Sequence, residues 1–135
     1  MKVVIIGGVA GGATAAARIR RLDEQAEIIV FERSGYISYA NCGLPYYIGD
    51  VITEKEELTL QTPQSFHSRF RVDMRVRHEV IAIDAANKTV TVRDIENDRT
   101  FTESYDKLLL SPGAKPSVPP FAGVESSRLF TLRTV

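Results

Sequence analysis

The sequence predicts an α/β fold of the Rossmann type, in which a parallel sheet carries an alanine-rich helix on one face and an antiparallel β-meander on the other. Three observations support this fold class. Residues 2–6 are an unbroken apolar run that leads into a glycine-rich loop. An alanine-rich segment and a second apolar run, residues 27–32, follow it. Later in the chain, three short runs rich in β-branched and aromatic residues are separated by turn-forming residues.

The first part of the chain has the pattern of a βαβ unit. Residues 2–6 and 27–32 are predicted strands buried on both faces, because apolar residues follow one another in them without alternation. Residues 13–23 between them are predicted to form a helix. Two strands joined in this way should be parallel and connected by a right-handed crossover.

The predicted helix presents two stripes of side chains. The stripe expected to pack on the sheet consists of Ala15, Ile19 and Leu22. The neighbouring stripe, spaced i, i+4, i+7, consists of Thr14, Arg18 and Arg21. Two arginines and a hydroxyl on one stripe could bind phosphates, although the spacing alone favours an ordinary solvated face.

The next segment combines irregular chain with short helices. Residues 34–61 have no regular pattern, and a short helix is expected within residues 41–48. Thr62 is the predicted N-cap of a further helix, with Pro63 at its first position and its end near Phe70.

The second half of the chain is predicted to be mostly strand. Residues 72–76 alternate apolar and charged side chains, as a half-exposed strand does. The meander is expected to consist of residues 80–83, 89–95 and 100–105. Residues 108–110 are three leucines and are predicted to form another buried strand. Four of the six prolines lie at or after residue 112, so the C-terminal segment should be extended and irregular, and the absence of a closing element suggests a piece of a larger protein.

The composition argues against several classes of protein. With 135 residues, 44% of them hydrophobic and 25% charged, the chain fits one globular domain. Its 17 basic and 17 acidic residues cancel, which removes the overall charge typical of nucleic-acid-binding proteins. One cysteine and two histidines are too few for an internal disulfide or a zinc site, so no metal is expected.

The sequence also predicts a cytoplasmic protein. No segment reaches the roughly 18 apolar residues of a membrane span. Residues 3–17 are uncharged, as in a signal peptide, but their four glycines and the arginine-rich residues 18–21 argue against that interpretation. A single thiol suits a reducing compartment, where it is either buried or reactive.

The glycine-rich loop, residues 7–12, is the first candidate site. Glycines at a strand–helix junction allow a tight turn and a close approach to a diphosphate, and the helix N-terminus supplies free N–H groups. Glu32 lies 20 residues beyond Gly12, where an acid can accept hydrogen bonds from a ribose. The loop departs from G-x-G-x-x-G at Val9, which replaces the middle glycine. The strand, loop, helix and terminal acid together favour a nucleotide site over a glycine-rich turn that binds nothing.

Cys42, the only cysteine, is the second candidate. It lies in residues 38–47, Ser-Tyr-Ala-Asn-Cys-Gly-Leu-Pro-Tyr-Tyr, at the expected start of a short helix. A helix N-terminus favours the thiolate, which is the form that attacks disulfides. Composition alone favours the alternative, a buried and inert cysteine.

Four segments together resemble the N-terminal part of the coenzyme A disulfide reductases: the glycine loop and residues 31–33, 38–47 and 105–114. These enzymes are FAD-dependent pyridine nucleotide-disulfide oxidoreductases, as are NADH oxidases and rhodanese-fused persulfide reductases. The resemblance covers essentially the whole chain, and Asn41-Cys42 is its most specific part. Many members of the wider family carry C-x₄-C, but Tyr47 stands at the second position here, which excludes an internal disulfide. The single-cysteine branch uses a mixed disulfide with coenzyme A, a persulfide or a sulfenic acid.

The resemblance implies roles for individual residues. It makes Cys42 the nucleophile and redox-active thiol near the flavin. The residues implied in FAD binding are Gly7, Gly8, Ala10, Gly11, Gly12, Glu32, Arg33, Asn41, Val80, Ser111, Gly113 and Arg133. Those implied in coenzyme A binding are Thr14, Arg18, Arg21, Ser38 and Asn41, with Arg69 and Arg71 as further phosphate partners on a looser match.

The resemblance also implies a domain organisation and an activity. Residues 1–135 would be the N-terminal part of an FAD-binding domain, and the NAD(P)H-binding and dimerisation domains of a homodimeric enzyme would follow residue 135. The intact enzyme would use NAD(P)H and FAD to reduce coenzyme A disulfide or another small disulfide or persulfide through Cys42, and this part alone should be inactive. Two alternatives are an NADH oxidase that cycles through a sulfenic acid and a non-catalytic nucleotide-binding module. Neither nucleic acid nor a membrane is an expected partner.

Overall fold

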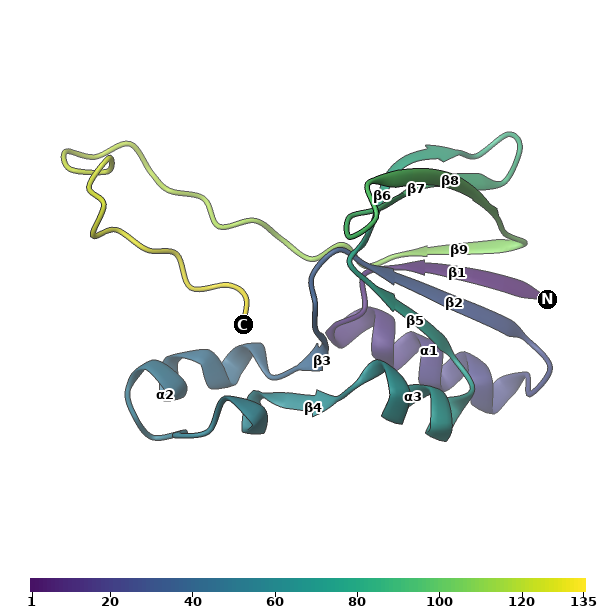
Figure 1. Ribbon diagram of the computed structural model, residues 1–135, viewed down its shortest axis with the longest axis horizontal. Helices are drawn as coiled ribbons and strands as arrows, with labels where there is room; N and C mark the ends of the chain where they lie inside the picture. The colour runs from purple at the N-terminus through teal and green to yellow at the C-terminus, as the bar shows by residue number, and fades with distance from the viewer.

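The computed structural model describes residues 1–135. Its centre is a four-stranded parallel sheet in the order β5-β2-β1-β9, formed by β1 (Lys2–Ile6), β2 (Glu27–Glu32), β5 (Asp73–Val76) and β9 (Lys107–Leu110). One face of this sheet carries the helices α1 (Ala10–Leu22) and α3 (Pro63–Phe70), as Figure 1 shows. The other face carries an antiparallel sheet of β6 (His78–Asp84), β7 (Thr89–Asp94) and β8 (Arg99–Ser104). The predicted fold class is confirmed.

A smaller unit extends beyond the carboxyl ends of the central strands, level with the layer of α1 and α3 (Figure 1). It contains the antiparallel pair β3 (Ile37–Tyr39) and β4 (Thr59–Gln61), two 3₁₀ helices (Asn41–Gly43 and Lys55–Leu58) and α2 (Leu44–Ile48). The short helix expected within residues 41–48 is therefore present, as a 3₁₀ turn followed by α2. The sequence did not predict the β3–β4 pair, because strands of three residues are too short to show a period.

Alternate residues of β1 belong to two different cores. Val3 and Ile5 pack in the core beneath α1, whereas Val4 between them packs with Val90 and Val92 of the meander. Val3, Val4 and Ile5 are each at most 3% exposed. The prediction of a strand buried on both faces is confirmed. Because β1 is held on both faces, the position of its carboxyl end, where the glycine loop begins, is fixed.

Helix α1 starts three residues before its predicted start, at Ala10, and one predicted contact is wrong. Ala15 and Ile19 pack against the core as expected, but Leu22 is 70% exposed. The buried residues of the helix are Gly12, Ala13 and Ala16. With 3.6 residues per turn, Leu22 lies about 130° around the helix from the mean direction of these residues, and it is the last residue of α1, so it faces solvent.

Two further elements form as the sequence predicted. Helix α3 begins with a capping box, in which the Ser65 amide donates to Thr62 Oγ1 at 3.1 Å and the Thr62 amide donates to Ser65 Oγ at 2.9 Å. The meander strands pair antiparallel in the order β6-β7-β8, with a bulge in β6 between Val80 and Ala82. Capping and alternation are local signals, which is why sequence alone located these elements.

The prediction that residues 108–110 form a buried strand is wrong in its burial. Strand β9 is the edge strand of the central sheet, paired only with β1. Leu108 and Leu109 are half-buried against the two cores, and Leu110 is 60% exposed. An apolar run shows that a strand has two apolar faces, but it does not show that another strand covers its edge.

Asp94, at the turn between β7 and β8, links the stability of the meander to pH. Its carboxylate, 2% exposed, accepts hydrogen bonds from Asn97 Nδ2 at 2.8 Å and from Arg99 Nε at 3.0 Å. These donors, with the Asn97 side chain foremost, lower the pKa of Asp94 from 3.8 to about 2, although desolvation opposes them. The ionised carboxylate therefore stabilises the fold above pH 3.8, and that contribution is lost as the pH falls toward 2.

We expect Asp94→Asn to lower the melting temperature by about 5 °C near neutral pH, because Arg99 loses its anionic partner. The difference from the wild type should shrink as the pH falls from about 4 to about 2, where the wild-type carboxylate is itself protonated. Thermal melts followed by circular dichroism across this range check the prediction. Asp98→Asn, an exposed neighbour in the same turn, is the control. A difference that does not vary with pH would contradict the role given to Asp94.

Residues 111–135 contain no helix or strand, as predicted. They leave the end of β9 as an extended arm and turn back so that the C-terminus lies beside the smaller unit that contains β3 (Figure 1). Arg133 Nε donates to the carbonyl oxygen of Ala114 at 3.0 Å, which returns the end of the arm to its start. None of the helices is both long enough and apolar enough to span a bilayer.

Candidate functional site

The carboxyl ends of β1, β2 and β9 meet at one edge of the central sheet. Gly7 follows β1, Glu32 ends β2 and Ser111 follows β9. Two backbone hydrogen bonds of 2.8 Å join these ends, from Gly7 N to Phe31 O and from Ser111 N to Ile6 O. Ligands of parallel α/β sheets bind outside this edge, so the glycine loop and the acid lie where a nucleotide would bind.

Glycines allow the three elements of this edge to approach one another. A Cβ at Gly12 would overlap the carbonyl oxygen of Gly7, and a Cβ at Gly7 would overlap the carbonyl oxygen of Ser111. Gly7 also has a φ of +97°, a conformation that costs other residues strain. A side chain at Gly12 would therefore separate α1 from the end of β1, and one at Gly7 would separate the end of β1 from the segment after β9.

The N-terminus of α1 opens toward the same edge. Its N-cap is Val9, which makes no side-chain capping bond, and its first turn has no acidic residue. The first N–H groups of the helix therefore remain available to an anion. Ala10 and Gly11 are exposed in this first turn, as an anion-binding helix start requires.

Glu32 is a buried carboxylate, 8% exposed, at the end of β2. Its two oxygens accept hydrogen bonds from the amides of Gly8 and Ser34, each at 2.8 Å. These bonds fix the orientation of the side chain, and a carboxylate has further lone pairs that can accept from a ligand hydroxyl.

Two adjacent cavities bring most of the predicted cofactor residues together. The first, of about 220 Å³, is lined by predicted residues Gly7, Glu32, Arg33, Val80 and Gly113. The second, of about 270 Å³, shares Glu32, Arg33 and Gly113 and adds Asn41, Ser111 and Arg133. Gly8, Ala10, Gly11 and Gly12 lie beside these cavities, in the loop and the first turn of α1, and do not line them.

Sequence reasoning missed several lining residues. His78 and Glu79 line the first cavity, and Lys115 lines both. Tyr39 lines the second cavity, and its hydroxyl donates to the carbonyl oxygen of Arg133 at 3.5 Å. Burial raises the pKa of Tyr39 although Arg133 acts against it, so this phenol stays a protonated donor. Tyr39 lies within residues 38–47 and Lys115 directly follows residues 105–114, two segments that the sequence pattern had already marked, and this was the available signal.

The site fits an elongated nucleotide such as FAD. The glycines and the uncapped start of α1 suit a diphosphate, and Glu32 suits a ribose. Asn41 adds a polar atom that needs a partner, since its Oδ1 is buried and has no hydrogen bond within the chain. Buried polar atoms are almost always paired, so this oxygen is suited to a donor on a ligand.

Cys42 is exposed and lies in the 3₁₀ helix that precedes α2. The buried position that composition favoured for this cysteine is therefore wrong. The thiol does not line either of the two cavities, but its neighbour Asn41 lines the second. Gly43 on its other side is buried, where a Cβ would meet Leu58 Cδ2 at 2.7 Å. The close contact at Gly43 fixes the turn that presents Cys42 to solvent beside the cavity.

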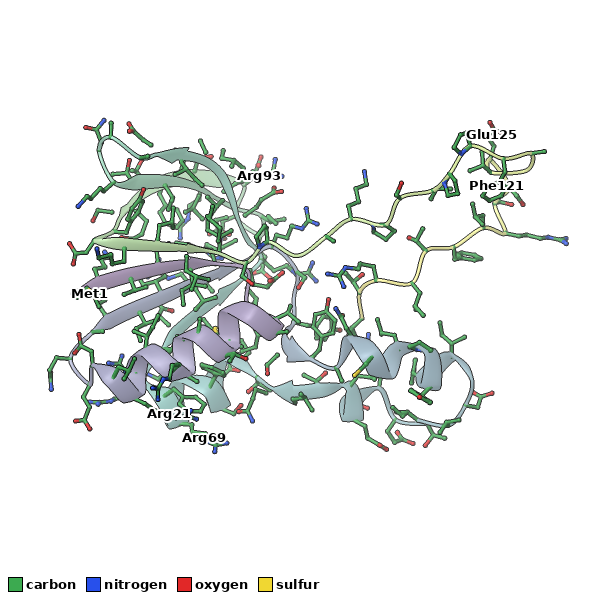
Figure 2. The ribbon with its side chains drawn as sticks, turned by 180° about the vertical axis from the view of Figure 1, so that it is seen from behind. Met1, Arg21, Arg69, Arg93, Phe121 and Glu125 are labelled. Carbon is green, nitrogen blue, oxygen red and sulfur yellow. The ribbon has the colours of Figure 1, made fainter.

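The predicted substrate residues are spread over a wider surface. Thr14, Arg18 and Arg21 are exposed along α1, and Ser38 is half-buried beside the glycine loop, with its amide donating to Gly8 O at 3.0 Å. Arg21 and Arg69 lie on the same side of the molecule (Figure 2). The Arg71 guanidinium is already engaged, since its Nη2 donates to the carbonyl oxygen of Glu24 at 3.3 Å. The arginines therefore form a surface that runs from the loop along α1, outside the cavities.

Comparison with known proteins gives a family match over the whole chain. The family described as pyridine nucleotide-disulphide oxidoreductase matches residues 1–135. A coenzyme A disulfide reductase of Staphylococcus aureus strain JH9 is 46% identical over 134 residues, which are 99% of this chain and 30% of that protein. The same identity and coverage are found in the reductase of strain Mu3.

Solved structures give the same result. The reduced CoADR-RHD of Bacillus anthracis matches with a TM-score of 0.95 and 55% identity, over 99% of this chain and 24% of that one. A NAD-dependent persulfide reductase from A. fulgidus has a TM-score of 0.92 and 37% identity, over 99% and 25%. A water-forming NADH oxidase from Lactobacillus brevis has a TM-score of 0.85 and 36% identity, over 95% and 28%. The chain spans less than a third of the length of these relatives.

Proposed function

Because the chain belongs to the pyridine nucleotide-disulphide oxidoreductase family, as its sequence predicted, we propose that it is the N-terminal part of the FAD-binding domain of a coenzyme A disulfide reductase. The observation that carries this proposal is the setting of Cys42. It is an exposed thiol beside the cofactor cavities, and Tyr47 takes the place of a second cysteine. The substrate is coenzyme A disulfide or a related small disulfide or persulfide, and the reductant is NAD(P)H.

FAD would be held by the residues that meet at the edge of the sheet. The diphosphate would bind to the glycine loop and the first turn of α1, which include Gly7, Gly8, Ala10, Gly11 and Gly12. Glu32 and Arg33 would hold the adenosine ribose, and Val80 would contact the adenine. Asn41, Ser111, Gly113 and Arg133, which line the second cavity, would bind further along the cofactor.

Cys42 carries the disulfide chemistry. Its thiolate attacks one sulfur of coenzyme A disulfide, the substrate S–S bond breaks, and one coenzyme A leaves as a thiolate that takes a proton from solvent. A mixed disulfide between Cys42 and the second coenzyme A remains, because no neighbouring cysteine can expel it. The mixed disulfide at Cys42 would accept two electrons, which releases this coenzyme A and restores the Cys42 thiolate. FAD, when bound, would supply that two-electron chemistry, with NAD(P)H as the source of the electrons.

The phosphates of coenzyme A lie along the exposed stripe of α1. Arg18 and Arg21 supply charge-assisted hydrogen bonds to phosphate, and Thr14 a hydroxyl, with Ser38 and Asn41 nearer the thiol. This assignment gives the arginines a function that their spacing alone did not establish.

We expect Arg18→Ala/Arg21→Ala to raise the KM for coenzyme A disulfide about tenfold or more, because two charge-assisted phosphate contacts are lost. Steady-state assays of the intact protein with coenzyme A disulfide and with the phosphate-free hydroxyethyl disulfide measure the effect, which should be confined to the first. Arg93→Ala/Arg128→Ala removes the same charge from exposed positions elsewhere and is the control. An unchanged KM in the α1 variant would make the stripe an ordinary solvated face.

The alternative function is an NADH oxidase, which the likeness to the Lactobacillus brevis enzyme favours. In that case Cys42 would be oxidised to a sulfenic acid and reduced again, with oxygen as the acceptor. The two functions are separated by measuring NADH consumption with coenzyme A disulfide, a persulfide or oxygen as the electron acceptor. Consumption that depends on coenzyme A disulfide supports the reductase, and consumption by oxygen alone overturns it. A purified protein without flavin absorbance would favour a non-catalytic nucleotide-binding module.

A further inference from the structure

Arg20 lies in the last turn of α1, half-buried, and donates hydrogen bonds to four backbone carbonyl oxygens. Its Nε donates to Phe70 O at 2.8 Å and its Nη2 to Arg71 O at 2.8 Å. Its Nη1 donates to Asp23 O at 3.2 Å and to Glu24 O at 2.7 Å. The acceptors are the last residue or the cap of α3 and the cap and following residue of α1, so one guanidinium joins the C-terminal ends of two helices.

The two helix ends are also joined in the opposite direction. Arg71, the C-cap of α3, donates from Nη2 to Glu24 O at 3.3 Å, just beyond the end of α1. Arg71 has a φ of +51°, the left-handed conformation that ends a helix and turns its carbonyl group away from the helix axis. The relative position of α1 and α3 is therefore fixed at these ends, and Arg20 makes most of the contacts.

The joined ends carry the arginines proposed to meet substrate phosphates. Arg21 follows Arg20 on α1 and Arg69 precedes Phe70 on α3, and both are exposed on the same side of the molecule (Figure 2). Neither takes part in an ion pair of the chain. No acidic side chain therefore neutralises their charges. A ligand phosphate can contact both arginines only if the two helix ends hold them near each other.

Helix C-termini oppose the binding of phosphate. Each carries unpaired carbonyl oxygens equivalent to roughly half a negative charge. Two such ends beside Arg21 and Arg69 would repel an anion, unless a cation satisfies the carbonyl groups. Arg20 is that cation, and because four of its five N–H donors are used on carbonyl groups, it is not itself available to bind phosphate.

We propose that Arg20 is a positioning residue for the coenzyme A phosphates: it neutralises the C-terminal ends of α1 and α3 and joins them, so that Arg21 and Arg69 form one cationic surface. This proposal rests on the proposed function, since it takes coenzyme A as the ligand. It assigns a role to an arginine that does not touch the substrate.

The test uses Arg20→Gln in the intact protein, with Arg93→Gln as the matched control. Arg93 is an exposed arginine of the meander, paired with Glu79 at 2.7 Å, and lies far from Arg21 and Arg69 (Figure 2). Titration calorimetry measures binding of coenzyme A, and kinetics give the ratio of kcat/KM for coenzyme A disulfide to that for hydroxyethyl disulfide. We expect Arg20→Gln to weaken coenzyme A binding and lower this ratio, each about tenfold, and Arg93→Gln to change neither.

A purely structural role for Arg20 would lower kcat/KM for both disulfides alike, leave their ratio unchanged and leave coenzyme A affinity unchanged, and that result overturns the proposal. If Arg20→Gln does not fold, Arg20→Lys carries the test. Lysine keeps the charge but cannot hold four carbonyl groups in a planar fork, so coenzyme A should bind about threefold more weakly, and wild-type affinity would overturn the proposal. A wild-type protein that does not bind coenzyme A at all would refute the proposed function itself, and the role of Arg20 with it.

Discussion

Replacing Cys42 with serine in the intact protein is expected to abolish the reduction of coenzyme A disulfide, with a loss in kcat of at least about 1,000-fold. A serine hydroxyl is not ionised at neutral pH and is a far poorer nucleophile than a thiolate, so the attack on the disulfide sulfur does not occur. Cys42 is the only cysteine of the chain, and Tyr47 occupies the position of a second one, so no other thiol in this segment can replace it. Steady-state assays with coenzyme A disulfide and NADH measure the loss.

The same variant contains its own control. Cys42 is exposed and serine is nearly isosteric with it, so we expect the fold and the flavin content to be unchanged. Reduction of the bound flavin by NADH, followed by rapid-mixing absorbance, should also persist, because hydride transfer does not need the thiol. A Cys42→Ser protein that reduces coenzyme A disulfide at the wild-type rate would refute the mechanism.

Replacing Gly12 with valine is expected to abolish flavin binding, or to weaken it by at least about 100-fold. The first atom of the new side chain would overlap the carbonyl oxygen of Gly7. Gly7 and the start of α1 would then separate, and the N–H groups that face the diphosphate would lose their alignment. The flavin-to-protein absorbance ratio of the purified intact protein, with circular dichroism to confirm folding, is the measurement.

Gly12→Ala and Gly123→Val are the companion variants. The alanine adds only the Cβ, but that atom already meets Gly7 O, so flavin content should fall here too. Gly123 lies in the C-terminal arm, where a Cβ would meet no atom within 4 Å, and its valine variant should keep its flavin. Full flavin occupancy in a folded Gly12→Val protein would mean that the phosphate loop is not at residues 7–12.

The elements that sequence predicted well are those with local signals. Lys2–Ile6 and Glu27–Glu32 form strands with the predicted bounds, because an apolar β-branched run needs burial wherever it lies. Thr62 and Pro63 located the start of α3, because a capping box involves only adjacent residues. The predictions that were wrong, Leu22 on the sheet and Leu110 in a covered strand, depend on which distant segments pack against these residues.

The residues of the candidate site also differ in whether a local sequence signal marks them. The glycine loop and Glu32 were found from sequence because the spacing of a few residues limits what they can bind. The four acceptors of Arg20 could not be found, since they are backbone carbonyl groups and any residue supplies one. The lining by His78 and Lys115 was missed because it requires the start of β6 and the segment after β9 to meet at the cavity that Glu32 also lines, which only the folded chain shows.

If Cys42 stores one coenzyme A as a mixed disulfide, the intact protein should gain the mass of one coenzyme A per chain after incubation with coenzyme A disulfide. We expect mass spectrometry to show this added mass, with peptide mapping locating it on Cys42, dithiothreitol removing it and Cys42→Ser lacking it. A wild-type protein that turns over coenzyme A disulfide yet never carries this adduct, or carries it on another residue, would refute the role given to Cys42.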